Sequence, residues 1–170
     1  FNAGKGNTAF GGNTLMSNTT GEGNVAFGES ALPANTTGSS NTAVGKSAMV
    51  SNISGSGNSA FGYGSLLVNI SGLNNTGFGY RTLSSSISNN NTAVGSTSMY
   101  ENTTGSDNVA VGHQSLYTNL IGSNNVAIGS GALKNNTASY NVAVGKMPCL
   151  VIPLEYTIQP LDLTLYIQTQ

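Results

Sequence analysis

A five-residue pattern, Asn-x-Ala-Φ-Gly with Phe, Val or Ile at Φ, recurs nine times along the chain at intervals of 16 or 17 residues, once with Gly in place of Ala. A repeat this short cannot enclose a core of its own, so neighbouring repeats must stack to bury any surface. The sequence therefore predicts one elongated stack instead of separate globular domains. The first Asn of each repeat defines position 0, and these residues are Asn7, Asn24, Asn41, Asn58, Asn75, Asn91, Asn108, Asn125 and Asn141.

Positions 1 to 3 of the repeat have the composition of a short β-strand. Position 1 is Thr, Val or Ser and position 3 is Phe, Val or Ile, so these two side chains share one face of the strand. Position 2 faces the other way and is Ala in every repeat except one, where it is Gly77. Such small residues predict close packing against that face. The Gly at position 4 of all nine repeats predicts a strand end where a side chain is not tolerated.

Position 8 is Leu or Met in every complete repeat, and we expect a second short strand around positions 7 to 9 with this residue as its inward anchor. Positions 11 to 14 often read Asn-x-Thr-Gly, which is typical of turns. Both 16-residue repeats lose their residue after position 8, where a loss does not invert the strand faces. Abundant Gly and Asn and short apolar runs disfavour helices.

We therefore predict an all-β fold, a parallel β-solenoid or β-roll of about nine 17-residue coils over residues 1–146. At the usual strand spacing this is a rod on the order of 40 Å long. A two-strand coil, a flattened roll and a three-sided helix remain alternatives. The position-0 asparagines are expected to form a turn ladder that bonds the backbone of the next coil.

Composition narrows the classes of function. The net charge is −1, which gives no electrostatic basis for binding nucleic acid or an anionic membrane. Charged residues make up 6% of the chain, against about a quarter in an ordinary soluble domain. No apolar stretch approaches the roughly 20 residues of a membrane span. A surface of Asn, Ser, Thr and Gly favours an extracellular or virion fibre over a cytosolic enzyme.

The repeats carry no recognisable catalytic set. Their acidic residues lie at four different repeat positions, so no two stack as the carboxylate pair of a glycosidase would; they are Glu22, Glu29, Glu101 and Asp107. His113 is the only histidine and has no evident partner, and one aspartate cannot supply a calcium-binding roll. We therefore expect no enzyme activity, no metal site and no cofactor.

Two repeat positions place aromatic residues in successive coils. Tyr63 and Tyr80 occupy position 5, which also holds His113, and Tyr100 and Tyr117 occupy position 9. Stacked pairs of this kind ordinarily stabilise a sheet. They also form a candidate surface contact for a receptor or glycan, because exposed Tyr is common in binding sites.

Eight asparagines lie in Asn-x-Ser/Thr sequons, which would form a glycan stripe in a eukaryotic secretory protein. Turn preference explains the same Asn-Thr-Thr-Gly sequences equally well. The eight are Asn18, Asn35, Asn52, Asn69, Asn74, Asn90, Asn102 and Asn135.

Residues 147–170 depart from the pattern: they contain no Gly and no Asn, hold three of the four prolines, and include the lone Cys149, which excludes an internal disulfide. Our hypothesis is a reading-frame error. Restoring one adenine beside the Lys146 codon makes an in-register repeat possible, in which the codons of Ile152 and Ile158 supply Asn and those of Glu155 and Asp162 supply Gly. We expect no packed domain there. The chain begins inside a repeat at Phe1, so we also expect it to be a fragment.

The strand motif resembles the head repeats of YadA-like trimeric autotransporter adhesins, most closely in Asn24-Val25-Ala26-Phe27-Gly28 and Asn125-Val126-Ala127-Ile128-Gly129. Repeats such as Asn41-Thr42-Ala43-Val44-Gly45 followed by Asn-Thr-Thr-Gly turns are also similar to phage and bacterial tail-fibre-like proteins.

The resemblance implies a left-handed roll, three chains side by side, and an adhesive fibre segment on a cell surface or, alternatively, a virion. The apolar residues at positions 3 and 8 would form a coil core and an inter-chain core. The sequence does not indicate which position belongs to which core. An ice-binding solenoid is less well supported, because position 1 mixes Thr, Val and Ser where a Thr ladder is needed.

Overall fold

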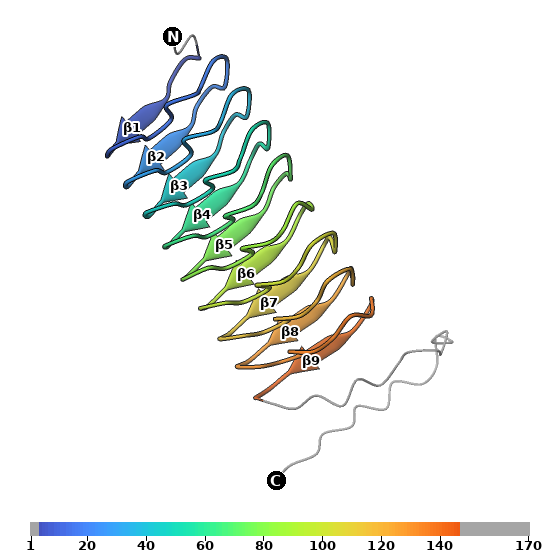
Figure 1. Ribbon diagram of the computed structural model, residues 1–170. Coiled ribbons are helices and arrows are strands. Elements are labelled where there is room, and N and C mark those ends of the chain that lie inside the picture. Colours follow the sequence, from blue (N-terminus) through green and yellow to red (C-terminus); the bar gives the residue numbers. More distant parts are fainter. Residues whose placement is uncertain (1–3, 147–170) are drawn as a thin grey trace.

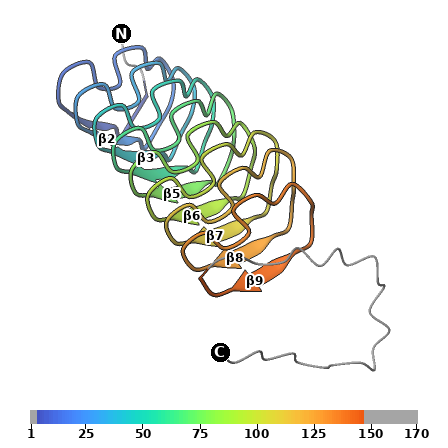
Figure 2. The ribbon, with the colours of Figure 1, turned by 60° about the horizontal axis from the view of Figure 1, so that its bottom comes forward.

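The computed structural model describes residues 4–146 as one rod of stacked coils (Figures 1 and 2). Within that range there are nine parallel strands and no helix, so the predicted all-β parallel solenoid is confirmed. The tail and the hypothesis about its reading frame lie outside the described residues. The strands are β1 (Thr8–Phe10), β2 (Val25–Phe27), β3 (Thr42–Val44), β4 (Ser59–Phe61), β5 (Thr76–Phe78), β6 (Thr92–Val94), β7 (Val109–Val111), β8 (Val126–Ile128) and β9 (Val142–Val144).

The strands follow each other in sequence order across one sheet, and each position pairs with the same position in the next coil. Ala43 of β3, for example, lies opposite Ala60 of β4. The register holds across both 16-residue coils, where Thr76 pairs with Thr92 and Val126 with Val142. The missing residue is therefore taken from the turns, and the strands are unaffected.

Hydrogen bonds identify the missing residue as position 13 of the repeat. The backbone N–H of Ile87 donates to the carbonyl of Thr103, which lies at position 12 of the next coil. The following residue, Ser88, already replaces the position-14 glycine, because its carbonyl accepts from Nδ2 of Asn75. Ala138 takes the same place in the other short coil. The prediction that the deletions fall in the turn half is confirmed.

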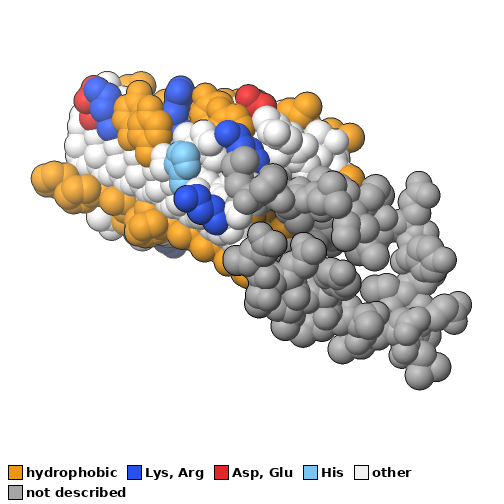
Figure 3. All heavy atoms as spheres, turned by 90° about the horizontal axis from the view of Figure 1, so that it is seen from below, with side chains coloured by type: hydrophobic (Ala, Val, Ile, Leu, Met, Phe, Trp, Pro, Cys, Tyr) orange, Lys and Arg blue, Asp and Glu red, His pale blue; other side chains and the backbone are white. Residues whose placement is uncertain are grey.

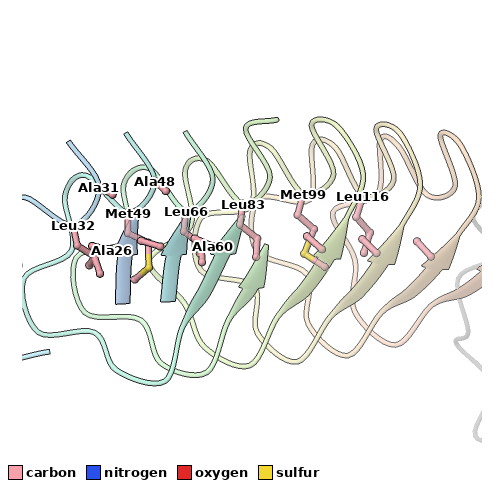
Figure 4. Close-up of a cluster of buried hydrophobic side chains, with 14 of the residues drawn as sticks. Ala26, Ala31, Leu32, Ala48, Met49, Ala60, Leu66, Leu83, Met99 and Leu116 are labelled. Atoms are coloured by element: carbon pink, nitrogen blue, oxygen red, sulfur yellow. The ribbon is translucent and has the colours of Figure 1, made fainter. Parts of the chain in front are cut away.

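The core is a column of small and large apolar side chains inside the coils (Figure 4). Ala at position 2 of the strand faces Leu or Met at position 8, and both are fully buried in the central coils. Position 7 closes the column with buried Ala, Ser or Thr. Gly77 is the exception at position 2 because a Cβ there would lie 2.5 Å from Oγ of Ser65 and 2.9 Å from Oγ1 of Thr82. The hydroxyl side chains of Ser65 and Thr82 thus occupy the space that a Cβ at residue 77 would need.

The predicted second strand around positions 7 to 9 is wrong, although its Leu or Met does point inward. This segment is a pair of turns in which positions 6 and 8 have positive φ, such as +55° at Ser30 and +50° at Leu32. Left-handed backbone costs a non-glycine residue roughly 1–2 kcal/mol. Burying a Leu or Met contributes about 1.5–3 kcal/mol, so the inward side chain offsets the strain. The backbone N–H of Leu32 still bonds the next coil, 3.1 Å from the carbonyl of Ala48.

Glycine at position 4 is required for two reasons. At Gly62 φ is +120°, a conformation that side chains strongly disfavour. A Cβ there would also lie 2.5 Å from the carbonyl oxygen of Gly79 in the next coil. The close approach of successive coils at the strand end therefore explains why this glycine occurs in all nine repeats.

Candidate functional site

The position-0 asparagines form an unbroken ladder inside the rod. Oδ1 of Asn41 accepts from the backbone N–H of Asn58 at 3.0 Å and from its Nδ2 at 3.2 Å. Nδ2 of Asn58 also donates to the carbonyl of Gly72 in its own coil, at 2.8 Å. The same bonds link Asn75 to Asn91 across the first short coil. This ladder ties the strand to the turns of its own coil and to the coil before it, so its role is structural.

A second ladder, at position 11, was not recognised from the sequence as a buried feature. Nδ2 of Asn52 donates to Oδ1 of Asn35 at 2.8 Å, and Asn69 donates in turn to Asn52. The ladder stops at both short coils, where Oδ1 of Asn69 and Oδ1 of Asn119 are buried without a hydrogen-bond partner. Each short coil therefore interrupts the amide-to-amide bonds between coils at this position. Its own turn stays bonded, since the hydroxyls of Ser86 and Ser88 lie 2.9 Å apart and Nδ2 of Asn136 donates to the carbonyl of Ala138 at 2.7 Å.

This second ladder decides which sequons a glycan could occupy. Five of the eight sequon asparagines are buried members of it, so a continuous glycan stripe does not fit the fold; they are Asn18, Asn35, Asn52, Asn69 and Asn102. The other three side chains are exposed, namely Asn74, Asn90 and Asn135.

Positions 1 and 3 of the strands lie on the outer face of the sheet, which we call the sheet stripe. The side chains at position 8 fill the coil core. Those at position 3 lie outside it and form a row of apolar side chains along the rod. Phe78 is 57% exposed, and its ring lies 5.5 Å from that of Phe61. Phe10 and Phe27 stack at 4.7 Å. A band of hydrophobic side chains follows the length of the rod in Figure 3. None of the 18 residues at these two positions is charged.

A second uncharged row, the turn stripe, runs along position 12, which is Ile or Leu in four coils and Thr in the other four. Its exposed apolar members are Ile53, Ile70, Ile87 and Leu120. The backbone at this position is bonded from coil to coil, since the N–H of Ile53 lies 2.9 Å from the carbonyl of Ile70. The side chains therefore remain in register and outside the coil core.

The tyrosine pairs identified from the repeat spacing are stacked along the rod. The rings of Tyr63 and Tyr80 are 5.6 Å apart and 12° from parallel, and those of Tyr100 and Tyr117 are 5.3 Å apart and 10° from parallel. Tyr63 and Tyr80 are each about half exposed, at 47% and 51%. Both pairs are placed by turns, at positions 5 and 9, instead of by strands.

The two pairs differ at their ends. Arg81 lies over the ring of Tyr100 at 5.5 Å, and Lys134 lies over the ring of Tyr117 at 5.8 Å. Each cation is attracted by the negative face of the ring it covers. The Tyr100–Tyr117 pair thus has a cation at each end. The sequence did not indicate this column, because Arg81 reaches it from position 6 and not from position 9.

Glu29 and Lys46, neighbours at position 5, form an exposed ion pair with an Nζ–Oε2 distance of 2.9 Å. The hydrogen bond to Glu29, followed by the negative charge of that carboxylate, raises the pKa of Lys46. The pair neutralises its own charge and places no net field on this face.

His113 is exposed at position 5, two coils along from Tyr80. Within residues 4–146 no group of three His, Cys, Asp or Glu side chains is close enough to hold a metal ion. The same residues contain no helix long and apolar enough to cross a membrane.

Comparison with known proteins finds no family model, no curated protein and no solved structure that matches this chain. The geometry itself offers two uncharged stripes and one face with aromatic and charged side chains on a regular parallel β-solenoid.

Proposed function

We propose that this chain is a structural and adhesive fibre segment, built from three copies side by side and displayed on a cell surface or a virion. The observation that carries the proposal is the pair of uncharged stripes along the outside of the rod, in which exposed Phe, Val, Ile and Leu side chains recur from coil to coil. Soluble monomers rarely leave contiguous apolar surface of this kind in water. Association along the rod axis would cover it.

Two different stripes support a ring. A single self-complementary patch makes a two-fold dimer, whereas two distinct patches let each copy contact two neighbours and close a ring. The sheet stripe of one copy against the turn stripe of the next meets this condition. Successive coils present both stripes with the same repeat, about 4.8 Å, so parallel copies can interdigitate along their full length.

The rest of the molecule suits a rod that bears load at an exposed location. Its buried asparagines form ladders from coil to coil, and these hydrogen bonds run along the axis. Tyr63, Tyr80 and His113 lie on the turns that follow the strands, and all three are exposed. In the proposed assembly they provide the face for contact with a receptor or glycan.

The mass in solution, measured by light scattering after size exclusion, tests the assembly. We expect three chains, and we expect Phe78→Asp and Ile70→Asp each to give monomers, because each places a charge in one stripe. Ser130→Asp adds the same charge at exposed position 5 and should leave the assembly intact. A monomeric wild-type protein would overturn the proposal, and an assembly that tolerates Ile70→Asp would overturn the two-stripe ring.

Adhesion is tested separately with beads coated with the protein and presented to immobilised cells or glycans. If beads coated with the wild type bind and beads coated with the monomeric variants do not, the assembled fibre has a role in adhesion. Failure of assembled protein to bind any tested surface would leave a fibre without adhesive function and would overturn that part of the proposal.

A further inference from the structure

The position-5 row has a gap in its series of rings. Tyr63 and Tyr80 are followed by Ser96 and then by His113, so one coil carries a small side chain between two coils that carry rings. We propose that this gap, the Ser96 notch formed by Tyr80, Ser96 and His113, binds one pyranose ring of a neutral glycan. The inference rests on the proposed adhesive function and names a ligand class and a place for it.

The backbone keeps the three residues in register. The N–H of Thr97 lies 2.8 Å from the carbonyl of Tyr80, and the N–H of Gln114 lies 3.1 Å from the carbonyl of Ser96. Tyr80 and His113 therefore belong to coils two steps apart, about 9.6 Å at the usual strand spacing. Ser96 is exposed, so the space above it is open to solvent.

The width of the notch favours a puckered ring over a flat one. Carbon atoms make their best contacts at about 3.5–4.0 Å, so a flat ring between two others spans roughly 7–8 Å. A pyranose chair is thicker than an aromatic ring by its pucker, and two such contacts around it span roughly 8–9 Å. The second value is closer to the separation of the two coils.

The ring of Tyr80 has one face available. Tyr63 covers the other face, with the two rings 12° from parallel. The Tyr100–Tyr117 pair differs, because Arg81 and Lys134 cover the outer ring faces at its two ends. A ligand that stacks on tyrosine thus meets an open face beside Ser96 and cation-covered faces at position 9.

The chemistry of the notch matches a neutral sugar. The face of an aromatic ring is negative and attracts the weakly positive C–H groups on the apolar face of a pyranose. The hydroxyl groups at the sugar's rim would meet the side chains of Ser96, Thr97 and Gln114, which are exposed or half-buried. Lys46 and Glu29 neutralise each other on the same row, and the cation next to Tyr80, Arg81, lies over the ring of Tyr100.

Ser96→Tyr is the decisive variant, because it fills the notch with the residue already present at positions 63 and 80. Ser130→Tyr is its matched control, since it adds a ring at the same repeat position on the other side of His113. Both should fold with a melting temperature no lower than that of the wild type, because added rings can stack on their neighbours.

Saturation-transfer NMR would measure binding of three probes to the assembled protein: methyl β-glucoside, methyl β-galactoside and N-acetyltryptophanamide, an aromatic competitor. We expect at least one glycoside to receive saturation mainly on the C–H groups of one face. Binding should weaken at least tenfold in Ser96→Tyr and stay within twofold in Ser130→Tyr. Equal or tighter glycoside binding by Ser96→Tyr, no binding of either glycoside by the wild type, or a preference for N-acetyltryptophanamide would overturn the inference.

The two proposals fail in different ways. If Ser96→Tyr remains assembled and its beads adhere as well as wild-type beads do, the notch is not the contact site and the adhesive fibre stands. If the glycoside binds the notch but the protein is monomeric and its beads do not adhere, the fibre proposal fails and the notch stands.

Discussion

The two asparagine ladders of this rod behave differently where the repeat loses a residue. At position 0, the backbone N–H of Asn91 bonds Oδ1 of Asn75 at 3.0 Å across the first short coil, as in every full-length coil. At position 11, the ladder ends at Asn69, and its Oδ1 is left buried without a partner. One ladder belongs to the strand half of the coil and the other to the turn half.

The difference shows which half of the repeat fixes the structure. A residue lost from a strand would turn the following side chains of that strand to the opposite face, whereas one lost from a turn costs only local hydrogen bonds. The strand half therefore keeps a strict composition of Asn, Ala and Gly. The turn half varies, and it carries the tyrosines, the ion pair and His113.

The largest expected effect is at the glycine that ends each strand. Gly62→Ala places a Cβ 2.5 Å from the carbonyl oxygen of Gly79 at a φ of +120°. We expect it to lower the free energy of unfolding by about 3 kcal/mol or more, or to prevent folding. Gly12→Ala, in the turn half, meets no atom within 4 Å and should change it by less than about 0.5 kcal/mol. Similar urea midpoints for the two variants would contradict the difference between the strand half and the turn half of the coil.

The ladders themselves give a smaller contrast. Asn58→Ala removes the acceptor of the Asn75 backbone N–H, two bonds donated by its own amide, and one accepted from the Asn75 amide. We expect a loss of about 3–4 kcal/mol, because buried polar groups are left unpaired. Asn69→Ala removes a side chain whose oxygen is already unpaired and should cost about 1–2 kcal/mol. Chemical unfolding at fixed protein concentration measures both, and a larger loss for Asn69→Ala would contradict the account.

The smallest effect is expected at the Glu29–Lys46 pair. The folded-state pKa of Lys46 is raised above its ordinary value of 10.5 by Glu29, so any stabilisation is fully present below that value and is lost as the pH rises through the folded pKa. Both side chains are exposed, and solvent screening keeps the contribution small. Thermal melts of Lys46→Ala and the wild type should coincide within error at neutral pH. A large difference between the two melting temperatures at pH 7 would show that this ion pair stabilises the fold despite its exposure, and would contradict the expectation.

The strand half could be predicted from the sequence because its pattern has a single explanation. Alternation at positions 1 to 3 and glycine at position 4 gave the strands and their parallel register. The turn half could not, because positions 6 and 8 adopt left-handed backbone without glycine in most coils, as at Leu32. No propensity rule anticipates a buried Leu there. The same turns hid the second ladder and the contact of Arg81 with Tyr100.

The candidate site was predictable to the extent that it follows the repeat. Counting positions was enough to pair Tyr63 with Tyr80 and Tyr100 with Tyr117. Counting could not show that position 3 faces solvent while position 8 fills the coil, because both are apolar. Burial in the folded coil separates them, and that separation carries the proposal of a side-by-side assembly.

The most direct test of the central claim is a pair of one-residue deletions in coil 41–57, which has the full length. Deleting Ser54 together with Gly55→Ser reproduces the Ile87-Ser88 arrangement of the natural short coil, whereas deleting Ala43 shortens the strand. Equilibrium urea unfolding should show a cooperative transition for the first variant, with a loss of about 1–3 kcal/mol from unpaired polar groups. The second should show no cooperative transition, because Val44 then takes the inward place of Ala43 and Gly45 no longer lies at the strand end. Equal losses in the two variants, or folding of the Ala43 deletion alone, would contradict the division of the coil into a register-setting half and a variable half.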